Sequence, residues 1–198
     1  MLAHSHRNLL VAALVFVVVL ATAAASWLSL GGGPVGGELR IGGPFALQDA
    51  NGRPFTDRDL RGHYTLVYFG YTFCPDVCPT TLTAVTTAMA KLGPRAERVL
   101  PVFITVDPER DTPAVLREYI SMFTPRLVGL TGTPEQIAAV AREYRVYYRK
   151  HAGSQGEGGY SVDHSSLLYL LDSDGRFIAP IPADESGEGI AAAIGRYL

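Results

Sequence analysis

Cysteine is scarce in this sequence of 198 residues: there are two, Cys74 and Cys78, separated by three residues. Small proteins that depend on disulfides for their stability are dense in cysteine, so a disulfide scaffold is excluded. If roughly the first 35 residues are set aside, about 160 remain, which is an ordinary size for one domain with a full hydrophobic core. The two cysteines are therefore not needed as structural crosslinks.

Charge is also sparse, and neither sign dominates. The formal net charge is −2, with 18% charged residues, and the sequence pI is about 6.2. The sequence shows no basic stripe, no run of like charges and no internal repeat. Because proteins that bind nucleic acids carry a basic patch, nucleic acid is excluded as a partner.

Only one apolar run is long enough to matter for a membrane. It occupies residues 9–30 and follows a single basic residue, Arg7. A bilayer is spanned by about 20 apolar residues, so the run predicts one N-terminal transmembrane helix. A cleaved secretory signal is the alternative, because Ala23-Ala24-Ala25 offers the small residues that a signal peptidase recognises. Both interpretations place the rest of the chain outside the cytoplasm, where a dithiol can be oxidised.

The length of the run favours the anchor, and the anchor predicts four parts of the chain. Residues 1–8 form a cytoplasmic N-terminus and residues 9–30 the transmembrane anchor. Residues 31–37 form a glycine-rich linker, which we expect to be flexible. Residues 38–198 form the folded domain.

The domain is organised around residues 66–82. An apolar run rich in Val, Tyr and Phe predicts a buried strand from His63 to Tyr71, and a helical pattern runs from about Pro79 to Leu92. Both cysteines then lie at the junction between the predicted strand and the predicted helix. Because a helix N-terminus favours thiolate over thiol, we expect both sulfurs to have lowered pKa values.

Strands and helices alternate along the rest of the domain. Further strands are predicted at residues 45–47, 54–55, 99–106, 127–130, 146–149, 165–171 and 176–179, and further helices at 112–123, 133–144 and 186–197. We expect residues 150–160, which are rich in glycine and serine, to form a loop. This order is typical of an α/β fold with a mixed central sheet flanked by helices. It matches the thioredoxin-like plan, in which cysteines also follow a central strand.

Cys74 and Cys78 could form a structural disulfide, a redox couple or part of a metal site. A disulfide across so short a loop constrains the unfolded chain weakly, which argues against the first use. Side chains four apart on a helix face the same way, so the two sulfurs could chelate one ion or form a reversible disulfide. The redox couple and the metal site both remain open.

A metal site needs a further ligand, and His63, His151 and His164 are the candidates. We interpret His63 as an edge residue at the start of a strand and His151 as a solvated residue of the predicted loop. His164 directly precedes an apolar strand and is a plausible ligand, although the sequence alone does not place it near the cysteines. Two thiolates and one imidazole are a soft ligand set that selects Cu(I), and Cu(II) also accepts them. A closed zinc site usually has a fourth ligand.

Several acidic residues lie near these candidates in the sequence. Asp163 could orient His164 or approach the metal, or could be a turn residue. Residues 107–113 leave a strand at its carboxyl end, the side on which open α/β sheets place their sites. They could line the pocket, offer a charged docking surface or cap the next helix. Asp76, between the cysteines, could tune their electrostatics or remain solvated.

Three segments, residues 68–79, 106–113 and 162–165, together resemble the SCO/SenC family of copper chaperones. The resemblance spans about residues 40–198, with the motifs in the family's order and spacing. It implies a thioredoxin-like fold tethered by one N-terminal membrane segment. The domain would face the periplasm from the cell inner membrane, or the intermembrane space in a mitochondrion. It also implies that Cys74, Cys78 and His164 bind one copper ion.

The same resemblance implies a partner, cytochrome c oxidase subunit II, to whose dinuclear copper centre the protein would deliver copper during assembly. An upstream periplasmic copper donor would load the site. The alternative function is a thiol–disulfide oxidoreductase that reduces the cysteines of that centre before metallation, with Cys74 and Cys78 as the redox pair. The three intervening residues, where thioredoxin-type enzymes have two, do not exclude it.

Overall fold

The computed structural model describes residues 14–22, 25–26, 40–124, 126–152 and 159–198. The chain divides into two units, Met1–Leu39 and Arg40–Leu198.

In the first unit, residues 14–22 and 25–26 are helical, and the apolar side chains from Leu14 to Leu20 are exposed. None of the helices in the described part of the chain is long and apolar enough to cross a membrane. The remainder of the predicted anchor (residues 9–30), the N-terminal residues 1–8 and the linker (residues 31–37) lie outside the described residues.

The second unit is built on a seven-stranded mixed sheet with the strand order β2-β1-β5-β4-β3-β8-β9. Strands β3, β4 and β5 pair in parallel, and the remaining pairs are antiparallel. Because β3 pairs with β4 on one side and β8 on the other, it is an interior strand, which explains its continuous apolar sequence. The strands are β1 (Ala46–Asp49), β2 (Pro54–Thr56), β3 (Tyr64–Gly70), β4 (Val99–Thr105), β5 (Val128–Thr131), β8 (Leu167–Leu171) and β9 (Phe177–Pro182).

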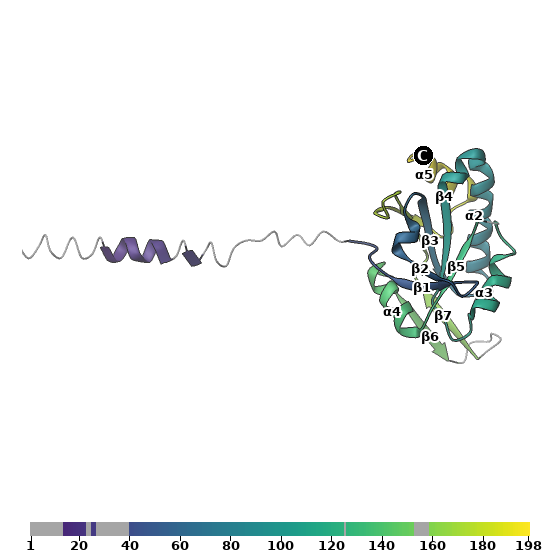
Figure 1. Cartoon of the computed structure of the whole chain (residues 1–198), viewed down its shortest axis with the longest axis horizontal. Coiled ribbons are helices and arrows are strands. Elements are labelled where there is room, and N and C mark those ends of the chain that lie inside the picture. Colours follow the sequence, from purple (N-terminus) through teal and green to yellow (C-terminus); the bar gives the residue numbers. More distant parts are fainter. Residues whose placement is uncertain (1–13, 23–24, 27–39, 125, 153–158) are drawn as a thin grey trace, which may run out of the picture. The chain divides into compact units, whose positions relative to one another are not determined.

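Helices cover both faces of this sheet. Figure 1 shows α2 and α3 on one side of the strands and α4 on the other. Crossovers between parallel strands are right-handed as a rule, so the connections from β3 to β4 through α2 and from β4 to β5 through α3 are expected on one face. Helix α5 packs against α2. The helices are α2 (Val77–Leu92), α3 (Pro113–Ile120), α4 (Pro134–Glu143) and α5 (Gly187–Gly195), with short 3₁₀ helices η1 (Asp57–Leu60) and η2 (Gly93–Arg98).

Side chains of β3 alternate between two buried layers. Tyr68 packs against Phe103 on the α2 face, with ring centroids 6.1 Å apart. Phe69 packs on the opposite face against Tyr144 and Tyr169, at 5.3 and 5.9 Å. A strand with apolar contacts on both faces is rigid, so the loop that leaves its carboxyl end starts from a fixed point.

A second, two-stranded ribbon consists of β6 (Tyr148–Ala152) and β7 (Tyr160–His164). It corrects the predicted loop, because β6 continues to Ala152 and β7 pairs with it from Tyr160 onward. The sequence pattern did not reveal the ribbon because most of its side chains are at least partly exposed, so no apolar alternation marks the strands. The other part of the predicted loop, residues 153–158, lies outside the described residues.

Most predicted helix starts are confirmed, and one is shifted. Thr112, Thr133 and Ser186 are N-caps whose side chains accept a backbone N–H, as expected for these residue types. Helix α2, however, begins at Val77 with Asp76 as its N-cap. Cys78 therefore lies inside the first turn of the helix.

Candidate metal centre

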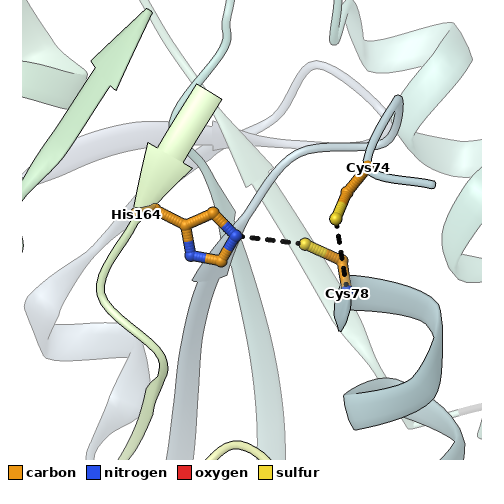
Figure 2. A group of neighbouring side chains, drawn as sticks. All are labelled: Cys74, Cys78 and His164. Atoms are coloured by element: carbon orange, nitrogen blue, oxygen red, sulfur yellow. Dashed lines mark hydrogen bonds between the residues drawn. The ribbon is translucent and has the colours of Figure 1, made fainter. Parts of the chain in front are cut away.

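Cys74, Cys78 and His164 converge at the carboxyl end of β3 (Figure 2). Cys74 lies in the loop that follows β3, Cys78 in the first turn of α2, and His164 at the end of β7. Their candidate ligand atoms all lie within 4.8 Å of one another. The structure therefore brings together the three residues that were predicted as ligands, although 86 positions separate Cys78 from His164.

The spacing of the atoms suits a single metal ion. The Cys78 Sγ lies 3.3 Å from the His164 Nε2, and the Cys74 Sγ accepts the Cys78 backbone N–H at 3.4 Å. Metal–nitrogen and metal–sulfur bonds of about 2.0 and 2.3 Å place a nitrogen and a sulfur about 3.5 Å apart around one ion. The side chains therefore need only small movements to enclose an ion.

The His164 ring presents its Nε2 to the sulfurs. Its Nδ1 lies 3.1 Å from the Ser165 carbonyl oxygen, which can only accept a hydrogen bond, so Nδ1 carries a proton. A bound ion would therefore take the lone pair of Nε2, as in histidines whose other nitrogen is fixed by a backbone carbonyl for metal binding. The rings of Tyr68 and Tyr71 contact this imidazole at 5.9 and 6.1 Å in edge-to-face geometry.

The two cysteines differ in protonation. Hydrogen bonds, first from the Cys78 thiol, then from His164 and then from the Cys78 and Asp76 backbone N–H groups, lower the pKa of Cys74 far below its ordinary value. The hydrogen bond to Cys74, together with burial, raises the pKa of Cys78. The prediction of two lowered pKa values is therefore wrong for Cys78. Helix α2 begins at Val77, two residues before the predicted start at Pro79. Its N-terminal N–H groups therefore point at Cys74, while the Cys78 side chain enters the core.

The pocket around the Cys78 sulfur is defined by Gly70 and Tyr68. A Cβ on Gly70 would lie 2.8 Å from the sulfur and 2.8 Å from the Phe103 ring, so only glycine leaves room for the sulfur there. The Tyr68 hydroxyl donates to the sulfur at 3.7 Å. Burial raises the pKa of Tyr68, so its hydroxyl remains a donor at all physiological pH values.

The Asp111 side chain fixes the position of the loop that precedes Cys74 (the cysteine loop). This role was not predicted from the sequence. Its buried carboxylate accepts hydrogen bonds from the Thr72 N–H at 3.0 Å and from the hydroxyls of Thr72 and Thr105 at 2.6 Å each. These bonds fix the loop that precedes Cys74 to the end of β4. The segment from 107 to 113 thus both caps α3 at Thr112 and supports the site.

The other predicted candidates do not join these three residues. His63 precedes β3, at the opposite end of the strand from the cysteines. His151 lies on β6, where its Nε2 contacts the Asp163 carboxylate at 2.8 Å. Asp163 thus pairs with His151, and the Ser165 carbonyl orients His164 in its place. Asp76 caps α2 and directs its backbone N–H toward Cys74.

Comparisons with known proteins agree with this geometry. A SCO2-like protein of Rickettsia prowazekii is 44% identical over 153 residues, which cover 77% of this chain and 75% of that protein. The protein SenC of Rhodobacter capsulatus is 44% identical over 161 residues, covering 81% and 72%.

A solved structure, that of Bradyrhizobium japonicum ScoI with copper bound, is 49% identical in sequence. It superposes with a TM-score of 0.73, covering 80% of this chain and 99% of the other. This likeness confirms the predicted thioredoxin-like α/β fold with its mixed central sheet. The sequence model of the SCO1/SenC family matches residues 34–198, and this chain therefore belongs to the SCO1/SenC family.

Proposed function

We propose that this protein is a metallochaperone that binds one copper ion through Cys74, Cys78 and His164. The observation that carries the proposal is the convergence of two sulfurs and one imidazole nitrogen within 4.8 Å. Thiolates are soft ligands that select Cu(I), and Cu(II) can be held by the same atoms with an added water. The copper-bound state of the related ScoI supports copper as the ion.

The different burial of the two sulfurs suits transfer of the ion. Cys78 is fully buried, whereas Cys74 is partly exposed and is flanked by the exposed side chains of Phe73 and Val77. A thiolate of a partner can therefore approach the ion from the Cys74 side and bind before the ion leaves its own ligands. We propose that the acceptor is the dinuclear copper centre of cytochrome c oxidase subunit II and that an upstream copper donor loads the site, as the family resemblance implies.

The proposal includes a membrane tether. Residues 9–30 would anchor the chain in the cell inner membrane, with the domain facing the periplasm, or in a mitochondrion the intermembrane space. The apolar run that follows Arg7 supports the anchor. Labelling of Cys74 in intact cells or spheroplasts with a membrane-impermeant maleimide would test this topology, because a cytoplasmic domain would remain unlabelled.

An anaerobic Cu(I) titration against a competing chelator tests the metal site. We expect one equivalent to bind tightly, and we expect Cys74→Ala, Cys78→Ala and His164→Ala each to weaken binding strongly. His151→Ala is the matched control, because His151 lies on the same ribbon but contacts Asp163 rather than the sulfurs. Native affinity in the His164→Ala variant would show that the ligand assignment is wrong.

A thiol–disulfide oxidoreductase is the second candidate, and the unequal cysteines favour it. One thiolate, Cys74, is partly exposed, and one protonated thiol, Cys78, lies behind it, which is the arrangement of an attacking and a resolving cysteine. A reductase needs both sulfurs but not His164. Reduction of an oxidised subunit II fragment by the His164→Ala variant at the wild-type rate, together with weak copper binding by the wild type, would favour this function over the chaperone.

A further inference from the structure

The ribbon that carries His164 is a separate element. Among the described residues, β6 and β7 pair with each other and with no strand of the main sheet. The two cysteines, in contrast, lie on the segment between β3 and α2, which belongs to the main body of the domain. Apart from the short link from His164 to β8, the distance from the imidazole to the sulfurs therefore depends on side-chain contacts that hold the ribbon against the body.

Arg110 makes contact with both segments that supply ligands. Its guanidinium lies over the ring of Tyr160 at 3.7 Å and over the ring of Phe73 at 4.9 Å. Its Nη1 also donates to the Tyr160 carbonyl oxygen at 3.1 Å. Tyr160 is the first residue of β7, and Phe73 directly precedes Cys74. One planar cation thus lies between the ribbon and the cysteine loop.

Asp107 fixes this cation to the end of β4. Its carboxylate is completely buried, pairs with Arg110 and accepts the Tyr160 hydroxyl at 2.7 Å. Its backbone N–H donates to the Thr105 hydroxyl at 2.9 Å, which holds the residue in place. A buried carboxylate is stable only when its partners are in place, so Asp107 strongly favours the position of Arg110 and Tyr160 seen here.

Lys150 adds a second contact between the ribbon and the same loop. Its Nζ lies 2.8 Å from a Glu109 carboxylate oxygen, 3.7 Å from Asp107 and 4.9 Å from the Tyr160 ring centroid. Lys150 and Glu109 are both exposed, so this ion pair contributes less than the buried contacts of Asp107 and Arg110.

We infer that Arg110 is a positioning residue: by joining Tyr160 to Phe73 over the buried Asp107, it sets the distance between His164 and the two sulfurs. Lysine cannot replace it, because stacking on two rings while donating to a carboxylate and a carbonyl requires the planar guanidinium with its several donors. The inference rests on the proposed function for its metal readouts, and it has a separate readout in the metal-free protein.

In the metal-free full-length chain, purified in a mild detergent, hydrogen–deuterium exchange reports the ribbon directly. We expect Arg110→Ala to speed exchange in β6 and β7 while β3 and β4 keep their protection. Arg176→Ala is the matched control, since Arg176 also pairs with carboxylates but in the turn between β8 and β9. If Arg110→Ala proves unstable, Tyr160→Leu removes the same contacts from the ribbon side and serves as the second variant.

In the copper-loaded chain, we expect Arg110→Ala to bind Cu(I) about tenfold more weakly, as is found when outer partners of metal ligands are lost. The same substitution made in the His164→Ala background is expected to cost no further affinity, because Arg110 acts through that imidazole. With Cu(II), the electron paramagnetic resonance signal of the variant should lose imidazole nitrogen coupling while the thiolate charge-transfer band remains. Arg110→Lys should restore little of either signal.

Two results would overturn the inference. One is unchanged exchange of β6 and β7 in both Arg110→Ala and Tyr160→Leu. The other is an equal loss of copper affinity from Arg110→Ala with and without His164, which would indicate a general loss of stability. If the wild type binds no copper, the proposed function fails, but the exchange experiment still decides whether Arg110 positions the ribbon.

Discussion

The backbone of Gly70 touches the sulfur of Cys78 so closely that a Cβ added at Gly70 would lie 2.8 Å from it. The same Cβ would lie 2.8 Å from the Phe103 ring. Both neighbours are packed in the core, so neither can move away without disturbing it. Gly70, the last residue of β3, therefore determines how closely the Cys78 sulfur can approach the strand.

Gly70→Ala should displace the Cys78 sulfur and weaken copper binding, with a loss of about 1–3 kcal/mol in the free energy of unfolding from overpacking. Chemical denaturation and Cu(I) competition measure the two effects. Gly195→Ala is the control, because a Cβ there meets only the flexible end of Arg95 at 3.7 Å. Native copper affinity in Gly70→Ala would show that the sulfur does not need the space.

The thiolate character of Cys74 predicts selective alkylation. Hydrogen bonds from Cys78 lower the pKa of Cys74, so iodoacetamide should modify Cys74 already near pH 6, where an ordinary thiol is unreactive. Cys78 should remain unmodified until the protein is unfolded, because it is buried and its pKa is raised. Mass spectrometry of the digested protein distinguishes the two sites, and equal modification at pH 6 would contradict the assignment.

The same difference predicts how copper binding depends on pH. At neutral pH Cys74 has already lost its proton, whereas Cys78 loses its proton only when the ion binds, because its pKa is raised. Binding should therefore release about one proton per ion, so the Cu(I) affinity should rise about tenfold per pH unit through the neutral range. Cu(I) competition at pH 6, 7 and 8 measures this slope. A slope of two would mean that the free protein holds a second proton on the ligand set, which would contradict the assignment.

Asp111→Ala should loosen the cysteine loop. The change leaves the partly buried N–H and hydroxyl of Thr72 and the buried hydroxyl of Thr105 without their carboxylate acceptor. Each buried unsatisfied group costs about 1–3 kcal/mol, so we expect at least that loss in the free energy of unfolding.

Asp111→Asn is the matched variant, because the amide oxygen can still accept the two bonds that now share Oδ2. Urea denaturation should rank the wild type first, Asp111→Asn second and Asp111→Ala last. A loss as large in the asparagine variant as in the alanine variant would show that the negative charge itself is required.

Local patterns in the sequence predicted the body of the domain well. The buried strand β3 is an unbroken apolar run because both of its faces are covered, and Thr112, Thr133 and Ser186 mark helix starts through their own side chains. In both cases the signal lies in the residues that form the element.

Features that depend on distant residues could not be predicted. The partners of Arg110 include Tyr160, 50 positions away, and those of Asp111 include Thr72, 39 positions away. The protonation of Cys78 depended on a shift of two residues in the start of α2, which is within the ordinary uncertainty of a helix boundary. The grouping of the three candidate ligands was predicted from the family resemblance, since no local pattern brings His164 to the cysteines.

The unequal cysteines also determine the net charge of the site in its two states. Without the ion, the two cysteines are one thiolate and one neutral thiol, which sum to −1. With Cu(I), two thiolates and one monovalent cation again sum to −1. Loading thus exchanges a proton for a monovalent ion at constant charge, and the surrounding core never has to accommodate an additional buried charge, which would be costly in a medium of low dielectric constant. A divalent ion would change this sum to zero, so the charge balance alone distinguishes the two oxidation states of copper.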